Sequence, residues 1–308
     1  MTTDALRLPE ASDSRAALLP AGLGYGLLAA LIWGAWPVVT RMGVQQSLEP
    51  ADIVALRFTV AGLILLPVLW KRGLGGLGWG RALLLAAGAG VPYVLVTATG
   101  LSIAPAGHAG IITPSCMLTA AMLGSWLLLG ERPDRLRLAG VGVILAGVLL
   151  IGARSLTDSS GGGWIGDLCF VAGGLLWASY TVGTRAWRVA PLHATALVSV
   201  ASMLLFLPPY LLFGEPQLFT APLEEIALQG LFQGLFAGVL ALLFYSRAVA
   251  ILGAARGAVF AALGPGLTVL LGIPLLGEHP GLAELAGLLL VSAGMLAALG
   301  LIRRRPNH

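Results

Sequence analysis

Ten apolar segments are the feature that most constrains the fold of this chain. They lie at residues 19–42, 51–70, 81–103, 107–130 and 136–153, and then at 164–188, 192–213, 225–250, 254–277 and 281–302. An α-helix needs about 20 apolar residues to cross a bilayer. Hydrophobic residues make up 57% of the chain and charged residues 10%, which is too little charge to cover a soluble protein. We therefore predict an all-α integral membrane protein with ten transmembrane helices.

The ten segments divide into two similar halves. At an offset of 144 residues, Trp36, Thr40 and Arg41 are matched by Tyr180, Thr184 and Arg185, and at 147 residues Gly130, Glu131 and Pro133 are matched by Gly277, Glu278 and Pro280. Because five helices per half is an odd number, the second half must enter the membrane upside down. Inverted repeats of this kind are typical of secondary transporters, which bind substrate between the halves.

The predicted organisation follows from these segments and from the polar stretches around them. We expect an N-terminal tail at 1–18, a first five-helix repeat at 19–153, a second, inverted repeat at 164–302, and a basic tail at 303–308.

The basic residues predict how the chain sits in the membrane. If the N-terminus is cytoplasmic, fifteen of the 18 Lys and Arg residues fall on the cytoplasmic side, Arg41 and Arg154 fall outside, and Arg57 lies within the second helix. Cytoplasmic loops carry such an excess. The ratio of 17 Arg to one Lys favours a bacterial source. We expect a multi-pass protein of the bacterial inner membrane with both termini in the cytoplasm.

Three stretches resemble the drug/metabolite transporter superfamily, and within it the ten-helix EamA type. They are the Trp-rich first helix, the segment FYSRAVAILGAARGAVFAALGP from Phe244 to Pro265, and Leu-Leu-Gly-Glu at the end of the ninth helix. This resemblance covers nearly all of residues 19–302. It implies a basket in which helices 1, 3, 4, 6, 8 and 9 line a central cavity. Within the family, the whole chain is most similar to bacterial YddG-like exporters of amino acids.

An aromatic stripe supplies the first candidates for substrate binding. Trp33, Trp36 and Thr40 share one face of the first helix, and Trp177, Tyr180 and Thr184 take the matching places in the sixth. Trp33 and Trp177 lie near the middle of their helices, whereas membrane tryptophans normally prefer the interface. A deep indole needs an internal partner or a wet cavity. We interpret the stripe as cavity lining, with simple interhelical packing as the alternative.

Further candidates lie near prolines and on the eighth helix. Proline frees backbone carbonyls that lipid cannot satisfy, so helix breaks usually face protein or water. We expect breaks at Pro92, Pro114 and Pro265. The remaining candidates for substrate contact are Tyr93, Thr97, His108, Ser115, Gln233, Tyr245 and Pro265. For each group a purely structural role is the alternative. Gly230, Gly234 and Gly238 indicate close helix packing.

Arg57 has two interpretations. It either reaches the outer surface, where Glu49 and Asp52 would pair with it, or it binds an anionic group. Arg41 and His108 are expected at the outer mouth of the cavity.

Several classes of function are disfavoured because the sequence lacks the residues or motifs that they need. No carboxylate lies near the middle of a predicted helix, which disfavours proton antiport by a buried acid. No HExxH motif, acid pair or P-loop appears, so a membrane-embedded enzyme, an ATP-driven pump and metal or other cofactors are not expected. Cys116 and Cys169 lie in apolar segments and predict no disulfide, and nucleic-acid binding is not expected.

Transport is therefore the predicted function. We expect export of small metabolites, chiefly amino acids with apolar or aromatic side chains, by alternating access and down the solute's own gradient. Proton-coupled efflux of other metabolites or drugs is the main alternative, and an enzyme or a structural or receptor role would be the other classes. The partners would be the small-molecule substrate and the lipid bilayer. The oligomeric state stays open, with a monomer as one option.

Overall fold

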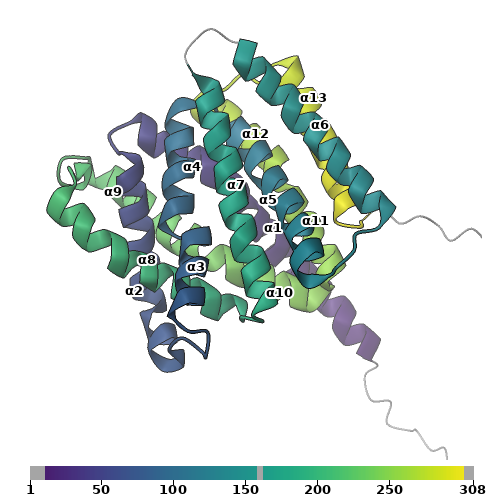
Figure 1. Ribbon diagram of the computed structural model, residues 1–308, viewed down its shortest axis with the longest axis horizontal. Coiled ribbons are helices and arrows are strands. Elements are labelled where there is room, and N and C mark those ends of the chain that lie inside the picture. The colour runs from purple at the N-terminus through teal and green to yellow at the C-terminus, as the bar shows by residue number, and fades with distance from the viewer. Residues whose placement is uncertain (1–10, 158–161, 302–308) are drawn as a thin grey trace, which may run out of the picture.

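The computed structural model describes residues 11–157 and 162–301 as an all-helical protein (Figure 1). The first half contains α1 (Ala11–Gln45), α2 (Pro50–Arg72), α3 (Trp79–Ala89), α4 (Val91–Ile103), α5 (Ala106–Leu129) and α6 (Arg135–Thr157). The second half contains α7 (Gly163–Ala186), α8 (Pro191–Phe213), η1 (Gln217–Phe219), α9 (Leu223–Gln229), η2 (Gly230–Leu240), α10 (Ala241–Leu252), α11 (Ala254–Ala262), α12 (Gly264–Leu276) and α13 (Leu282–Ala298). Helix α1 extends into the predicted N-terminal tail, whereas residues 1–10 and the predicted C-terminal tail lie outside the described residues.

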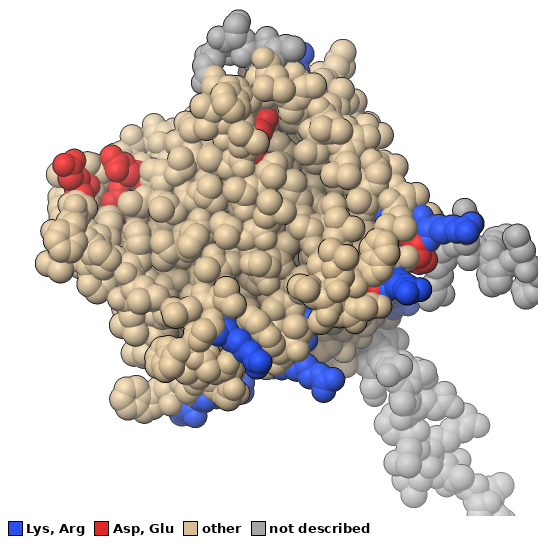
Figure 2. All heavy atoms as spheres, in the orientation of Figure 1, with Lys and Arg blue, Asp and Glu red and all other residues tan. Residues whose placement is uncertain are grey.

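These elements make ten membrane crossings, as predicted. Within the described residues, nine helical spans are long and apolar enough to cross a membrane, and the 17-residue α13 is the shorter tenth. Leucines such as Leu127 and Leu149 are 79% and 70% exposed, which is expected of side chains that face lipid. Figure 2 shows a broad surface free of charge, with most visible Lys and Arg along the lower and right edges. We call that end of the molecule the basic end.

Two of the three expected proline breaks are present. Pro92 is the second residue of α4, directly after the break at Gly90, and Pro265 holds the same place in α12. In each case proline lacks the N–H that would continue the preceding helix. The expected break at Pro114 is wrong, because α5 runs through this residue without interruption. A single proline removes one hydrogen bond, and a transmembrane helix packed among neighbours tolerates that loss.

The eighth crossing has a different irregularity. Its middle part, η2, is a π-helix of 11 residues between α9 and α10. Gly234 and Gly238 of η2 lie against Val60 and Ala61 of α2, so the predicted close packing is confirmed. Segments of π-helix occur frequently at functional sites, and this one carries Gln233.

The contacts between helices repeat from one half to the other. Helix α1 packs against α10 and α12, and its counterpart α7 packs against the corresponding segments α4 and α5. Likewise α2 packs against η2, and α8 packs against α3. Both repeats therefore build the centre of the molecule together.

Equivalent helices meet each other at the two edges of the molecule, α2 with α8 and α6 with α13 (Figure 1). A Cβ atom on Gly140 would lie 2.7 Å from the Gly294 carbonyl oxygen, and one on Gly147 would lie 2.9 Å from that of Gly287. Because the repeat offset here is 147, these are two copies of one contact, as in a two-fold interface. The pairing also runs antiparallel, which is the arrangement that an inverted repeat requires.

Candidate functional site

Six aromatic residues lie in the middle of the molecule, four of them in one chain of ring contacts and two in a separate pair. Trp36 of α1 stacks on Tyr93 of α4 with ring centres 5.8 Å apart, and Tyr93 meets the edge of Trp177 of α7 at 4.6 Å. Trp177 meets Tyr180 at 5.6 Å, and Trp33 meets Tyr245 of α10 at 5.1 Å. We call these residues the aromatic cluster: Trp33, Trp36, Tyr93, Trp177, Tyr180 and Tyr245.

The aromatic cluster lies deep in the expected membrane. Trp36 is nine residues from the end of α1, and Trp177 is fourteen residues from the start of α7. At 1.5 Å per residue these positions are about 13 Å and about 21 Å from the same end of the molecule. In contrast, Trp70 and Trp79 at the basic end are 85% and 73% exposed, as interfacial tryptophans are.

Gln233 fixes the polar edge of the aromatic cluster. Trp36 Nε1 donates a hydrogen bond to Gln233 Oε1 at 2.7 Å. Gln233 Nε2 donates to Thr40 Oγ1 at 2.9 Å and to Gln229 Oε1 at 3.1 Å. Gln233 and Thr40 are fully buried. The deep indole of Trp36 therefore has an internal partner, and its ring is held in a fixed orientation.

The other predicted hydroxyl groups donate to carbonyls of their own helices. Thr97 Oγ1 donates to the Tyr93 carbonyl at 2.7 Å, Ser115 Oγ to that of Ile111 at 2.6 Å, and Thr184 Oγ1 to that of Thr181 at 2.9 Å. Thr40 makes the same kind of bond to Trp36. In this conformation the hydroxyl protons of these residues are all used within their own helices. Pro265 is buried at the start of α12.

His108 lies apart from the aromatic cluster. Its Nδ1 atom is 2.8 Å from Asp167 Oδ1 and its Nε2 atom is 3.2 Å from Glu284 Oε1. The three side chains come from the N-terminal parts of α5, α7 and α13, at the end opposite the basic end. His108 and Asp167 are both buried, and Asp167 Oδ2 has no hydrogen-bond partner among the described residues. We call these residues the His108 cluster.

Two equivalent ion pairs lie at opposite ends of the molecule. Arg41 of α1 pairs with Glu278 after α12 at 3.2 Å, and Arg185 of α7 pairs with Glu131 after α5 at 2.6 Å. Gly277 and Gly130, which precede the two glutamates, both adopt the left-handed conformation that ends a helix, with φ of 65° and 73°. The same turn thus presents the same carboxylate in each repeat.

The two ends differ in how tightly they are closed. The side chains of Arg41 and Glu278 are 13% and 16% exposed, whereas those of Arg185 and Glu131 are 52% and 49% exposed. Glu278 also accepts hydrogen bonds from the amides of Ala106 and Gly107 at the start of α5, at 2.6 and 3.1 Å.

The basic end lacks the matching closure. Among the described residues, the Glu131 carboxylate accepts hydrogen bonds from Arg185 and from no backbone amide at the start of α11. Ile112 of α5 is 1% exposed, whereas its equivalent Val259 of α11 is 39% exposed. The end with Arg41 is closed in this conformation, and the basic end is more open.

Arg57 of α2 is buried beside the aromatic cluster. Its side chain is 8% exposed, and its guanidinium carbon lies 5.7 Å from the ring centre of Trp36. Among the described residues, the first interpretation of Arg57, an ion pair with Glu49 or Asp52, is not found. Asp52 instead accepts hydrogen bonds from the Tyr210 hydroxyl and from the amides of Glu49 and Gln217.

The two ion pairs were not predicted from the sequence, although the repeat offsets relate their residues to one another. The offsets of 144 and 147 make Arg41 equivalent to Arg185 and Glu131 equivalent to Glu278. In an inverted repeat, a contact made by one pair predicts the same contact by its equivalent at the other end. The order of residues alone does not reveal that the first contact exists.

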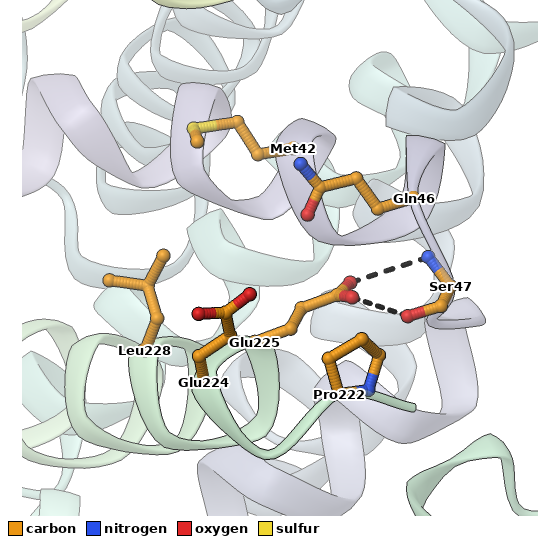
Figure 3. Close-up of a pocket in the computed structure, with 7 residues that line it drawn as sticks. All are labelled: Met42, Gln46, Ser47, Pro222, Glu224, Glu225 and Leu228. Carbon is orange, nitrogen blue, oxygen red and sulfur yellow. Dashed lines mark hydrogen bonds between the residues drawn. The ribbon is translucent and has the colours of Figure 1, made fainter. Parts of the chain in front are cut away.

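Two cavities lie away from the aromatic cluster. One of about 540 Å³ lies between the end of α1 and α9 (Figure 3), where Ser47 donates two hydrogen bonds to Glu225. A second, of about 280 Å³, lies between α3, α4 and α8 and is mainly apolar. We assign no substrate to either.

The fold and the site define the class of this protein. Ten membrane crossings in two inverted repeats, with aromatic side chains from both repeats at the centre, form the architecture of a secondary transporter. The family model of the EamA-like transporter family matches residues 20–153 and 164–300. The chain belongs to the EamA-like transporter family, and it is a membrane transporter rather than an enzyme.

Known relatives agree with this class. The chain is 28% identical over 293 residues to the "Uncharacterized inner membrane transporter YedA" of Escherichia coli (strain K12), which covers 90% of each chain. It is 28% identical over 277 residues to an "Uncharacterized transporter" of Archaeoglobus fulgidus, covering 87% of this chain and 93% of the relative. A solved crystal structure, 24% identical, matches with a TM-score of 0.61 over 92% of this chain and 97% of the other, which shows the fold alone. None of these relatives is named YddG.

Proposed function

We propose that this protein exports amino acids with apolar or aromatic side chains across the bacterial inner membrane by facilitated diffusion. The aromatic cluster is the observation that carries the proposal. Its rings come from α1, α4, α7 and α10, so both repeats contribute to it. Stacked and edge-on rings favour an apolar or aromatic side chain of the solute.

The charges around the aromatic cluster favour a zwitterion or an anion over a cation. Among the described residues, no ring contact or hydrogen bond of the cluster involves a carboxylate, whereas Arg57 lies over Trp36. An organic cation would normally require a buried acid beside it.

Alternating access is supported by the two equivalent ion pairs. In the proposed cycle, the Arg41–Glu278 pair closes the periplasmic end while solute enters from the basic, cytoplasmic end. In the opposite state, Glu131 would cap the start of α11 as Glu278 now caps α5. The repeats would thereby exchange their environments around a site near the midplane.

Proton-coupled efflux is the second candidate function. The His108 cluster favours it, because a buried histidine between two carboxylates is a titratable group within the membrane. This cluster lies near the periplasmic end rather than at the midplane, so it would control opening of that end and would not hold the solute.

Solute uptake by proteoliposomes tests the proposal. We expect saturable uptake of labelled phenylalanine and leucine without a pH gradient, with glycine taken up less. Trp33→Ala and Trp177→Ala are expected to reduce uptake at least about ten-fold, because each removes a wall of the aromatic cluster. Trp79→Ala, at an exposed position, is the matched control. Uptake that requires a pH gradient and is lost in His108→Gln would favour the proton-coupled alternative instead.

A further inference from the structure

Arg57 is a buried cation without a counterion. Within the described part of the chain it forms no ion pair, and its Nη1 atom is shielded from solvent without a hydrogen-bond partner. A guanidinium in this position is costly unless an anion or several acceptors compensate it. The ring of Trp36 supplies only a cation–π contact at 5.7 Å.

The acidic residue nearest to Arg57 on α2 makes its hydrogen bonds with other residues. Asp52, five residues before Arg57 on α2, accepts hydrogen bonds from Tyr210, Gln217 and Glu49, and those from Tyr210 and Gln217 direct its carboxylate toward α8 and the following loop. The Arg57 guanidinium carbon instead lies 5.7 Å from the ring centre of Trp36 and 6.0 Å from that of Phe58. The cation is therefore directed toward the aromatic cluster and away from the carboxylate that would neutralise it.

The second repeat shows that the scaffold does not need this cation. Pro67 and Pro208 fix an offset of 141 between α2 and α8, and Gly62 lies against its equivalent Met203 in the structure. At the same offset, Arg57 is equivalent to Val198, which is 4% exposed in the same core. One repeat thus buries an apolar side chain where the other buries an arginine.

We propose that Arg57 binds the carboxylate of the transported solute. This inference rests on the proposed function and deepens it, because it assigns one charge of the amino acid to a named residue. A carboxylate would accept hydrogen bonds from the Nη1 atom that now has no partner, in the bidentate geometry that arginine favours. The solute's side chain would then lie against Trp36 and Tyr93.

Binding of three matched probes to the purified protein tests this assignment. L-Phenylalanine has both charges, 3-phenylpropionate has only the carboxylate, and L-phenylalaninamide has only the amine. Calorimetric titration of wild-type protein should give affinities for both carboxylates at least about ten-fold higher than for the amide. In Arg57→Gln this preference should disappear.

Arg81→Gln is the matched control. Arg81 also lies 5.7 Å over a tryptophan ring, that of Trp187, but its side chain is exposed at the basic end. This variant should keep the preference for carboxylates. Should Arg57→Gln fail to fold, Arg57→Lys retains the charge and should bind the carboxylates more tightly than the amide, by a smaller factor.

Several results would overturn the assignment. They are wild-type protein that binds neither carboxylate, a folded Arg57→Gln variant that keeps the preference, an equal loss of affinity for all three probes, or an Arg57→Lys variant without preference. The proposed function can fail separately. If proteoliposomes move no amino acid while 3-phenylpropionate binds in an Arg57-dependent way, the carboxylate site stands and amino-acid export does not.

Discussion

At the residue scale, Gln233 determines how the aromatic cluster is held together. Its side chain links Trp36 and Thr40 on α1 to Gln229, and all of these groups lie away from solvent. A polar side chain with three hydrogen bonds in an apolar interior is stabilising only while its partners remain. The amide thus joins the two repeats at the level of the cluster.

Replacing Gln233 with leucine should destabilise the protein by about 1–3 kcal/mol, because the Trp36 N–H would be left buried without an acceptor. Denaturant titration in detergent measures this change. Gln46→Leu, at an exposed position in the turn directly after α1, should change the free energy of unfolding by less than about 0.5 kcal/mol. Equal stability of the two variants would contradict the role given to Gln233.

Individual residues were predictable only in part. The sequence identifies Trp36 and Tyr180 because aromatic residues at helical spacing stand out in apolar segments. It does not identify Gln233 as the partner of Trp36, which is 197 residues away. The same limitation holds for the His108 cluster, because His108, Asp167 and Glu284 come from three different helices and meet only after folding.

At the element scale, paired glycines set the distance between α6 and α13. A methyl group on Gly147 would meet the Gly287 carbonyl at 2.9 Å, whereas one on Gly142 of the same helix would meet nothing within 4 Å. We expect Gly147→Ala to destabilise the protein by about 1–3 kcal/mol through overpacking. Gly142→Ala should be neutral or slightly stabilising. Thermal unfolding in detergent compares the two, and a similar loss in both would show that helix flexibility, rather than packing, governs this edge.

Elements were the most predictable part of the fold. Ten crossings follow from segment length, and the breaks at Pro92 and Pro265 follow from the missing amide of proline. The uninterrupted α5 at Pro114 was not predictable, because the neighbouring helices that tolerate the proline are distant in sequence. The spacing of apolar residues also does not predict the π-helical segment η2.

At the scale of the whole molecule, the inverted repeat relates the two ends of the transport path. The closed end partly buries the ion pair of Arg41 and Glu278, so that losing it costs more free energy than losing an exposed pair. The exposed pair of Arg185 and Glu131 contributes about 0–1 kcal/mol. Glu278→Gln should therefore shift the population toward the state that is open at the Arg41 end, and Glu131→Gln should have little effect in the conformation described.

Distances measured between spin labels at both ends test this reciprocal motion most directly. With Cys116 and Cys169 replaced by alanine, one labelled pair would be placed at Gln46 and His279 and the other at Ala190 and Arg132. These are exposed positions that the repeat offsets make equivalent. Glu278→Gln should lengthen the first distance and shorten the second. If both distances lengthen together, or neither changes, the two repeats do not alternate in the way proposed.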